Sequence, residues 1–243
     1  MKAPRFGKGK GKEQQLRQTG TDGQRIQTVV FDFDGTLAQL RLNFGHMKRR
    51  LALMASEYLQ EVPEADRPVL EWLDFLERRI LERQAAGDGE FRSRATRMIV
   101  EMELLAAREG ALFPFTRTLL RQLEHDGVHA AIITRNCEAA VRMVFPDLED
   151  FCGCFLAREH VERVKPDPDH LRRVLVHFGS DPGTSLMVGD HPLDVQTGKR
   201  AGTLTAGVAS GSGSWDDLAS SGADWVAADC ESLFVDLRRT RLV

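Results

Sequence analysis

The sequence predicts an α/β protein built on a doubly wound, mainly parallel sheet, with a helical insertion after the first strand. Two observations support this prediction. From residue 113 onward, short apolar runs that suit buried strands alternate with stretches of helical spacing, a pattern typical of a parallel sheet covered by helices on both faces. Residues 38–111 separate this region from an earlier strand-like run and show only helical spacing.

The first expected strand is the apolar, β-branched run at residues 29–31, which leads into Asp32-Phe33-Asp34-Gly35. Because side chains alternate along an extended segment, Asp32 and Asp34 project to the same side. Two carboxylates at the end of a buried strand are costly unless a cation or a shared chemical task retains them. Open α/β sheets bind ligands at this place, so we expect the functional site here.

Residues 1–25 precede this strand and are rich in Lys, Arg, Gly and Gln. They contain almost no large apolar side chains beyond Phe6 and Leu16, so burial cannot offset the entropy cost of ordering them. We predict a disordered basic tail. A weak contact between its basic residues and a polyanion is the alternative.

Residues 38–111 carry apolar side chains at the spacing of helix faces, which predicts a separate helical domain. Asp66 followed by Pro68 is typical of a helix start, and residues 87–89 are typical of a turn between the second and third helices. We interpret the apolar stripes as the core of this domain. They are Met47, Leu51, Met54 and Tyr58; Leu73, Leu76 and Ile80; and Phe91, Ala95, Met98, Met102 and Leu105.

The rest of the chain is expected to form one core domain, residues 26–37 together with 112–243. After the first strand, its elements alternate along the sequence. Helices are expected near residues 116–125, 138–145 and 169–178 and from 193, and strands near 130–134, 151–157, 185–188 and 204–208, followed by two smaller units that end near 237.

The composition is that of an ordinary soluble globular protein. The chain is 42% hydrophobic and 28% charged, with a net charge of -3, which favours neither nucleic acid nor an anionic membrane as a partner. No apolar run approaches the ~18 residues of a membrane span, and no secretion signal is visible. The four cysteines lack the spacing of a zinc site and are expected to be reduced, which suits a cytoplasmic protein.

Several polar residues stand at the expected strand ends or in the adjoining loops. Four of them form an acidic set of hard oxygen ligands, which favours Mg²⁺ over softer metals. These aspartates are Asp32, Asp34, Asp190 and Asp194. Thr134 ends another strand, and Lys165 begins the loop sequence Lys-Pro-Asp-Pro.

In this order, the motifs resemble those of the haloacid dehalogenase-like superfamily. They are residues 29–37, the strand ending in Thr134, the loop beginning at Lys165, and residues 188–190 with Asp194 beyond. The similarity extends from Ile26 to Phe234 and is greatest to the branch with a helical cap that includes phosphoglycolate phosphatase. It implies a Rossmann-like core, with residues 38–111 as a cap over the active site.

The resemblance also implies individual functions. Asp32 would be the nucleophile that forms an aspartyl-phosphate, and Asp34 would protonate the leaving group and later take a proton from water. Thr134, Arg135, Gly35 and Lys165 would bind the phosphoryl group. The Asp32 carboxylate, the Asp34 backbone carbonyl and Asp190 would hold Mg²⁺, with Asp194 orienting a metal-bound water or Lys165 from behind.

The expected function is therefore that of a Mg²⁺-dependent phosphatase acting on a small phosphorylated metabolite. Asp34 argues against a dehalogenase, because displacing halide needs no leaving-group proton. A sugar phosphomutase of the same superfamily and a non-catalytic interaction module remain alternatives. At the level of residues, Thr134 could be only a turn residue, Lys165 a loop lysine and Asp194 a helix cap.

The sequence identifies neither the substrate nor the oligomeric state. Candidate cap residues for substrate contact are Arg41, Asn43, Phe44 and Arg92. His191 stands where relatives usually carry a small hydroxyl residue, and we interpret it as a loop histidine.

Overall fold

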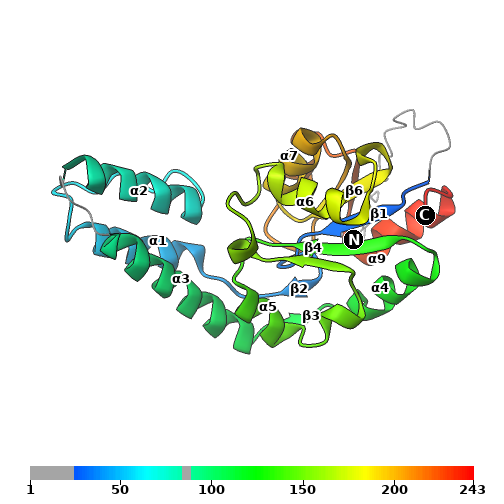
Figure 1. Ribbon diagram of the computed structural model, residues 1–243, viewed down its shortest axis with the longest axis horizontal. Helices are drawn as coiled ribbons and strands as arrows, with labels where there is room; N and C mark the ends of the chain where they lie inside the picture. Colours follow the sequence, from blue (N-terminus) through cyan, green and yellow to red (C-terminus); the bar gives the residue numbers. More distant parts are fainter. Residues whose placement is uncertain (1–24, 84–88) are drawn as a thin grey trace, which may run out of the picture.

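The computed structural model describes residues 25–83 and 89–243 (Figure 1). Except for Arg25, the tail expected at residues 1–25 lies outside the described residues, as does most of the turn expected at 87–89. Figure 1 shows a sheet flanked by helices, from which further helices extend to one side.

The core contains a six-stranded parallel sheet with strand order β5-β4-β1-β6-β7-β8. Its strands are β1 (Thr28–Phe31), β4 (His129–Ile133), β5 (Cys154–Leu156), β6 (Ser185–Gly189), β7 (Leu204–Val208) and β8 (Trp225–Ala227). The central strand β1 has β4 on one side and β6 on the other. Ligands of open parallel sheets bind at the carboxyl ends of strands beside such a reversal of order.

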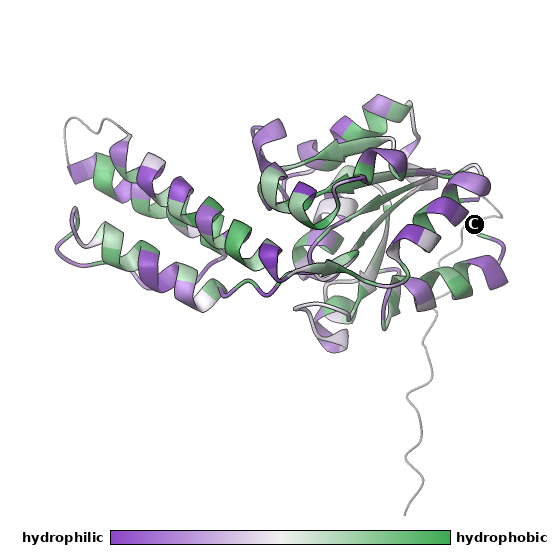
Figure 2. Ribbon diagram, turned by 90° about the horizontal axis from the view of Figure 1, so that it is seen from below, coloured by the Kyte–Doolittle hydropathy of each residue, from purple (hydrophilic) through white to green (hydrophobic). Residues whose placement is uncertain are grey.

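Helices cover both faces of the sheet because successive side chains of each strand point to opposite faces. The core helices are α4 (Thr116–His125), α5 (Glu138–Val144), α6 (Asp169–Phe178), α7 (Pro192–Ala201), α8 (Trp215–Ser220) and α9 (Cys230–Arg239), with 3-10 turns η1 (Leu148–Asp150), η2 (Arg158–His160) and η3 (Pro182–Thr184). Val29 and Phe31 pack in the hydrophobic cluster that includes residues of α4, α5 and α9, whereas Val30 packs in the cluster that includes residues of α6 and α7. Figure 2 shows the apolar strands inside and the polar helix faces outside. The predicted doubly wound α/β fold is confirmed.

The cap contains three helices, α1 (Phe44–Ala55), α2 (Val69–Arg83) and α3 (Glu90–Arg108), which share a cluster of buried residues of their own. The predicted stripes supply most of this cluster. Leu105, the last residue of the third stripe, is instead 56% exposed. The reason is that the C-terminal part of α3 leaves the cap bundle and packs against α5, with Ala107 in the core cluster.

Two short strands that the sequence did not predict close the base of the cap. β2 (Ala38–Gln39) and β3 (Ala111–Leu112) pair antiparallel. Just outside this pair, the carbonyl of Leu37 accepts hydrogen bonds from Phe113 and Thr116. Two residues are too few to display the alternation that reveals a strand. The domain boundaries expected at 37/38 and 111/112 coincide with this pairing and stay a prediction.

None of the described helices combines the length and apolarity that crossing a membrane requires. The four cysteines carry free thiols, three of them buried.

Candidate active site

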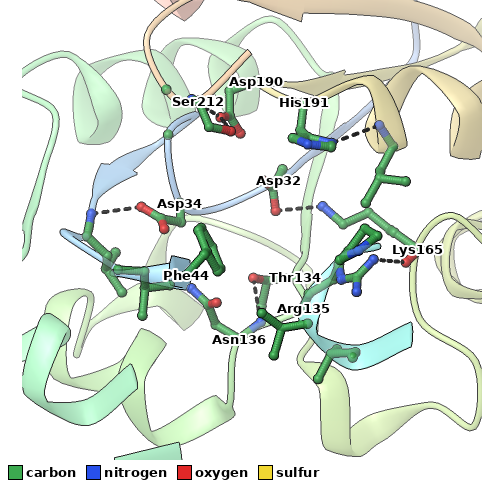
Figure 3. A pocket seen from close by; sticks show the side chains of 18 of the residues that line it. Asp32, Asp34, Phe44, Thr134, Arg135, Asn136, Lys165, Asp190, His191 and Ser212 are labelled. Atoms are coloured by element: carbon green, nitrogen blue, oxygen red, sulfur yellow. Dashed lines mark hydrogen bonds and ion pairs between the residues drawn. The ribbon is translucent and has the colours of Figure 1, made fainter. Parts of the chain in front are cut away.

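A cavity of about 730 Å³ is lined by both the carboxyl edge of the sheet and the cap (Figure 3). Core residues reach it from the segments after β1, β4, β5, β6 and β7. All the site residues expected from the sequence line this cavity. They are Asp32, Asp34, Gly35, Thr134, Arg135, Lys165, Asp190 and Asp194.

Lys165 lies at the centre of the carboxylates and is 2% exposed. Its Nζ donates hydrogen bonds to Asp32 Oδ1 at 2.6 Å and to Asp194 Oδ1 at 2.7 Å. Burial acts against the ammonium ion, but the charges of Asp194 and Asp32 outweigh it, so the pKa of Lys165 is raised. The lysine is therefore a fixed buried cation rather than an exposed loop lysine.

A loop after β7 holds Asp190. The backbone N–H of Ser212 and its hydroxyl both donate to Asp190 Oδ2, at 2.6 and 2.9 Å. Ser210 donates its hydroxyl to the carbonyl of Gly35 at 2.6 Å. Gly35 has a positive φ of 82°, and a Cβ there would lie 2.6 Å from the Asp190 carboxyl carbon, so only glycine fits.

Sequence reasoning missed this loop. The run of small residues at 209–214 directly follows a predicted strand, and such runs after a strand of a parallel sheet lie at the ligand-binding edge. That signal could have identified Ser210 and Ser212.

The cavity brings together more carboxyl groups than Lys165 alone can neutralise. Burial is the largest cause that raises the pKa of Asp32, that of Asp34 to about 7 and that of Asp190 to about 8. Neighbouring carboxylates add to the effect at all three residues. A site of this kind is suited to a further cation.

The donor set fits a hard divalent cation. Asp32, Asp190 and Asp194 each offer a carboxylate oxygen, and these oxygens lie within 4.8 Å of one another. Both oxygens of Asp194 already accept hydrogen bonds, Oδ1 from Lys165 and Oδ2 from the backbone N–H of His191 at 3.1 Å. Asp32 and Asp190 are therefore the better placed to ligate an ion.

Thr134 and Arg135 follow β4. Thr134 is 1% exposed and accepts from the backbone N–H of Asn136 at 3.2 Å. The Arg135 guanidinium donates to both carboxylate oxygens of Glu71 in α2, at 2.7 and 2.6 Å, and to the carbonyl of Lys165 at 2.9 Å. Its side chain thus binds the cap, and its contact with phosphate stays a prediction.

A second ion pair joins cap and core. Arg158 donates to both oxygens of Glu103 in α3, at 2.6 and 3.0 Å, and Glu103 also accepts from the backbone N–H of Cys137. Glu103 is 3% exposed. Sequence reasoning missed this pair because its partners are 55 residues apart and no motif links them.

The cap residues expected near the substrate differ in position. Arg41 and Phe44 line the cavity. Asn43 instead caps α1, accepting from the backbone N–H of His46 at 2.8 Å, and Arg92 pairs with acidic residues of α2. His191 lines the cavity and caps α7, because its Nδ1 accepts from the backbone N–H of Leu193 at 3.1 Å.

His170 supports the loop that carries Lys165. Its Nδ1 accepts from the Lys165 backbone N–H at 3.3 Å, so its Nε2 carries the proton and donates to the carbonyl of Leu156 at 3.1 Å. Burial, followed by the charge of Lys165, lowers its pKa from 6.5 to about 4. Arg135 acts in the same direction and Asp32 against it. Protonation of His170 at Nδ1 would place an N–H group opposite the backbone N–H of Lys165 and break this hydrogen bond.

This arrangement predicts that His170 destabilises the fold in acid. The pKa of His170 is 6.5 in the unfolded chain and about 4 in the folded protein, so between these values only the unfolded chain takes up the proton. The contribution of His170 to stability is therefore full above pH 6.5 and falls as the pH falls toward 4. The stability difference between wild type and His170→Asn should shrink by about 2 kcal/mol from pH 7 to pH 5. Urea unfolding at both pH values measures it, and a constant difference would contradict the assignment.

The sequence model of the haloacid dehalogenase-like hydrolase family matches residues 29–208, and the chain belongs to this family of enzymes. The family expected from the motifs is therefore confirmed. Its members include relatives with assigned names and solved structures of the same fold.

Pyrophosphatase PpaX of Bacillus velezensis is 37% identical over 92 residues, which cover 37% of this chain and 43% of that protein. The match therefore spans less than half the length of this relative. A haloacid dehalogenase-like hydrolase domain-containing protein of Arabidopsis thaliana is 27% identical over 182 residues, 74% of this chain and 70% of that protein. The structure of a predicted phosphoglycolate phosphatase from Haemophilus somnus shares the fold with a TM-score of 0.57 and 21% identity, covering 91% of this chain and 100% of that one.

Proposed function

We propose that the chain is a Mg²⁺-dependent phosphatase that hydrolyses a small phosphomonoester through an aspartyl-phosphate intermediate. The observation that carries the proposal is the position of Asp32, buried beside the cation Lys165 and within reach of Asp190. A carboxylate that attacks an anionic phosphoryl group needs cations nearby to offset the repulsion between the two negative charges. The names of the relatives, a pyrophosphatase and a predicted phosphoglycolate phosphatase, support phosphoryl chemistry.

The proposed reaction has two steps, formation of the aspartyl-phosphate and its hydrolysis. Asp32 Oδ1 is held by Lys165, which leaves Oδ2 to attack phosphorus. As that bond forms, the bond from phosphorus to the ester oxygen breaks and Asp34 gives its proton to the departing oxygen. Asp34 then takes a proton from water, whose oxygen attacks the phosphorus of the aspartyl-phosphate. Phosphate leaves and the Asp32 carboxylate is restored.

The surroundings of Asp34 suit this exchange of protons. Its Oδ1 accepts from the backbone N–H of Leu40 at 2.8 Å, which fixes the carboxyl group at the boundary between core and cap. Its raised pKa of about 7 is close to neutral pH, where a group can both give and take a proton. Thr134 and Lys165 would donate to the phosphoryl oxygens.

Mg²⁺ would be held by the carboxylates of Asp32 and Asp190 and the backbone carbonyl of Asp34, and it would neutralise charge on the phosphoryl group. Ser212 fixes the Asp190 carboxyl group with two hydrogen bonds to Oδ2. Asp194 uses its oxygens on Lys165 and on the backbone of His191, so we assign it to the orientation of Lys165.

A panel of phosphate compounds with and without Mg²⁺ tests the proposal. It should contain phosphoglycolate, pyrophosphate, several sugar phosphates and an aryl phosphate. Release of inorganic phosphate from at least one ester, dependent on Mg²⁺, is expected. Sugar phosphates that isomerise without releasing phosphate would favour the phosphomutase alternative, and no reaction with any compound would contradict the proposal.

Replacing Asp190 by Asn should weaken Mg²⁺ binding by about 10- to 100-fold, because it removes a formal charge from the ion's surroundings. The rise of the thermal midpoint with increasing Mg²⁺ measures this binding without relying on turnover. Asp150→Asn removes the same charge from an exposed position outside the cavity and serves as the control. Identical Mg²⁺ titrations of the two variants would refute the metal assignment.

A further inference from the structure

Asn136 carries a buried hydrogen-bond donor that no described residue accepts. The side chain is 7% exposed, and its Nδ2 is buried without a partner within residues 25–83 and 89–243. The backbone of the same residue is satisfied: its N–H donates to Thr134 Oγ1 at 3.2 Å, and its carbonyl accepts from the Arg158 N–H at 3.2 Å. Buried donors in folded proteins are almost always paired, so the free amide marks a place where a ligand atom could bind.

The amide faces the cavity rather than a packed interior. Asn136 is among the residues that line it. Figure 3 shows its side chain on the side of Thr134 that is away from Asp32 and Lys165, directed toward Phe44 of the cap. A phosphoryl group attached to Asp32 would lie beside Thr134, so the part of a substrate that reaches Asn136 is the leaving group.

Two arginines that line the cavity, Arg135 and Arg158, are already matched by acidic partners. Arg135 is paired with Glu71, and Arg158 is paired with Glu103. Beside these two arginines, a second anionic group on the substrate would also meet the carboxylates that pair with them. A neutral oxygen atom could accept from the free amide donor of Asn136 without meeting that repulsion.

Part of the cap side of the cavity is apolar. Leu42, Phe44, Met47 and Ile99 line the cavity from the cap side. Phe44 begins α1 and is 50% exposed, so its ring is available to a ligand in the cavity that it lines. Carbon atoms of a leaving group would contact this wall.

We propose that Asn136 determines specificity by donating a hydrogen bond from Nδ2 to an uncharged oxygen of the leaving group. The substrate class is then a phosphomonoester of an alcohol that carries a second hydroxyl or carbonyl oxygen on a carbon skeleton. This inference rests on the phosphatase function proposed above. It concerns recognition only, because Asn136 exchanges no proton and forms no bond with phosphorus.

Three esters test the inference: propyl phosphate and its 2-hydroxy and 3-hydroxy derivatives, each of which has one oxygen atom more than propyl phosphate. Wild type should favour at least one hydroxylated ester by about tenfold or more in kcat/KM, since a site built to hydrogen-bond a hydroxyl group discriminates against the analogue that lacks it. In Asn136→Leu, kcat/KM for that ester should fall about 10- to 100-fold and stay within about threefold for propyl phosphate.

Two further variants distinguish the amide donor from the size and the general polarity of the side chain. Asn136→Asp keeps the size and an acceptor but loses the donor, so it should lose the same preference. Gln39→Leu removes an exposed amide that also lines the cavity, and it should keep the preference. The thermal midpoint of Asn136→Leu should not fall, because removing an unpaired buried donor breaks no hydrogen bond among the described residues.

The outcomes separate this inference from the phosphatase function. Equal losses on all three esters in Asn136→Leu, a preference that survives in Asn136→Leu or Asn136→Asp, or a wild type that hydrolyses the three esters equally would each overturn the inference and leave the phosphatase function standing. A wild type that hydrolyses no phosphate ester of any kind would overturn both.

Discussion

Asp34→Asn is expected to release about one equivalent of phenol from an aryl phosphate in a rapid burst and then to turn over very slowly. An aryl oxide leaves without a proton, so the first step survives the loss of the Asp34 carboxyl group. Hydrolysis of the aspartyl-phosphate does need a base to take the proton of water. Its rate should fall by about 10² to 10⁴. On alkyl phosphates, whose leaving oxygen needs the proton, both steps should be slow.

Asp32→Asn is the matched comparison, because it removes one carboxylate from the same loop. It should show no burst with any substrate, since no aspartyl-phosphate can form. Rapid-quench measurements on both variants with one aryl phosphate give the result directly. Loss of the burst in both would contradict the separate functions that we assign to Asp32 and Asp34.

Lys165→Met is expected to destabilise the fold by about 3–5 kcal/mol, because it leaves two buried carboxylates without their cation. Asp32 and Asp194 both depend on the Lys165 Nζ, at 2.6 and 2.7 Å. Urea unfolding without added Mg²⁺ gives the value. Lys199→Met, which removes an exposed lysine, should change stability by less than about 0.5 kcal/mol and serves as the control.

A double variant tests the physical cause. Adding Asp194→Asn to Lys165→Met removes one of the uncompensated charges, so it should recover about 1–3 kcal/mol. If the two substitutions were simply additive, electrostatic coupling between Lys165 and Asp194 would not be the cause of the loss.

The sequence predicted those parts of the fold that depend on local pattern. The helix at α6 and the strand at β7 fall at their expected residues, because their apolar side chains follow one regular spacing. Asp32, Lys165 and Asp190 line one cavity, as expected, because each belongs to a motif at a strand end or in an adjoining loop. Their chemical functions stay predictions.

The sequence could not predict contacts between residues that are distant along the chain and belong to no motif. Arg135 and Glu71 are 64 residues apart, and nothing in either local pattern names the other as its partner. The free amide of Asn136 is a further example, because whether a buried donor is paired depends on the packing of every neighbour. Leu105 has the right spacing for the cap bundle but lies where α3 has already passed to the core.

The pairing of β2 with β3 brings the entrance and the exit of the cap side by side. Leu37, just before the cap, is hydrogen-bonded to Phe113 and Thr116, just after it, so the junction between core and cap is held by residues that belong to none of the three cap helices. An evolving gene can therefore lengthen, shorten or exchange the segment between these strands while the sheet and its carboxylates keep their places.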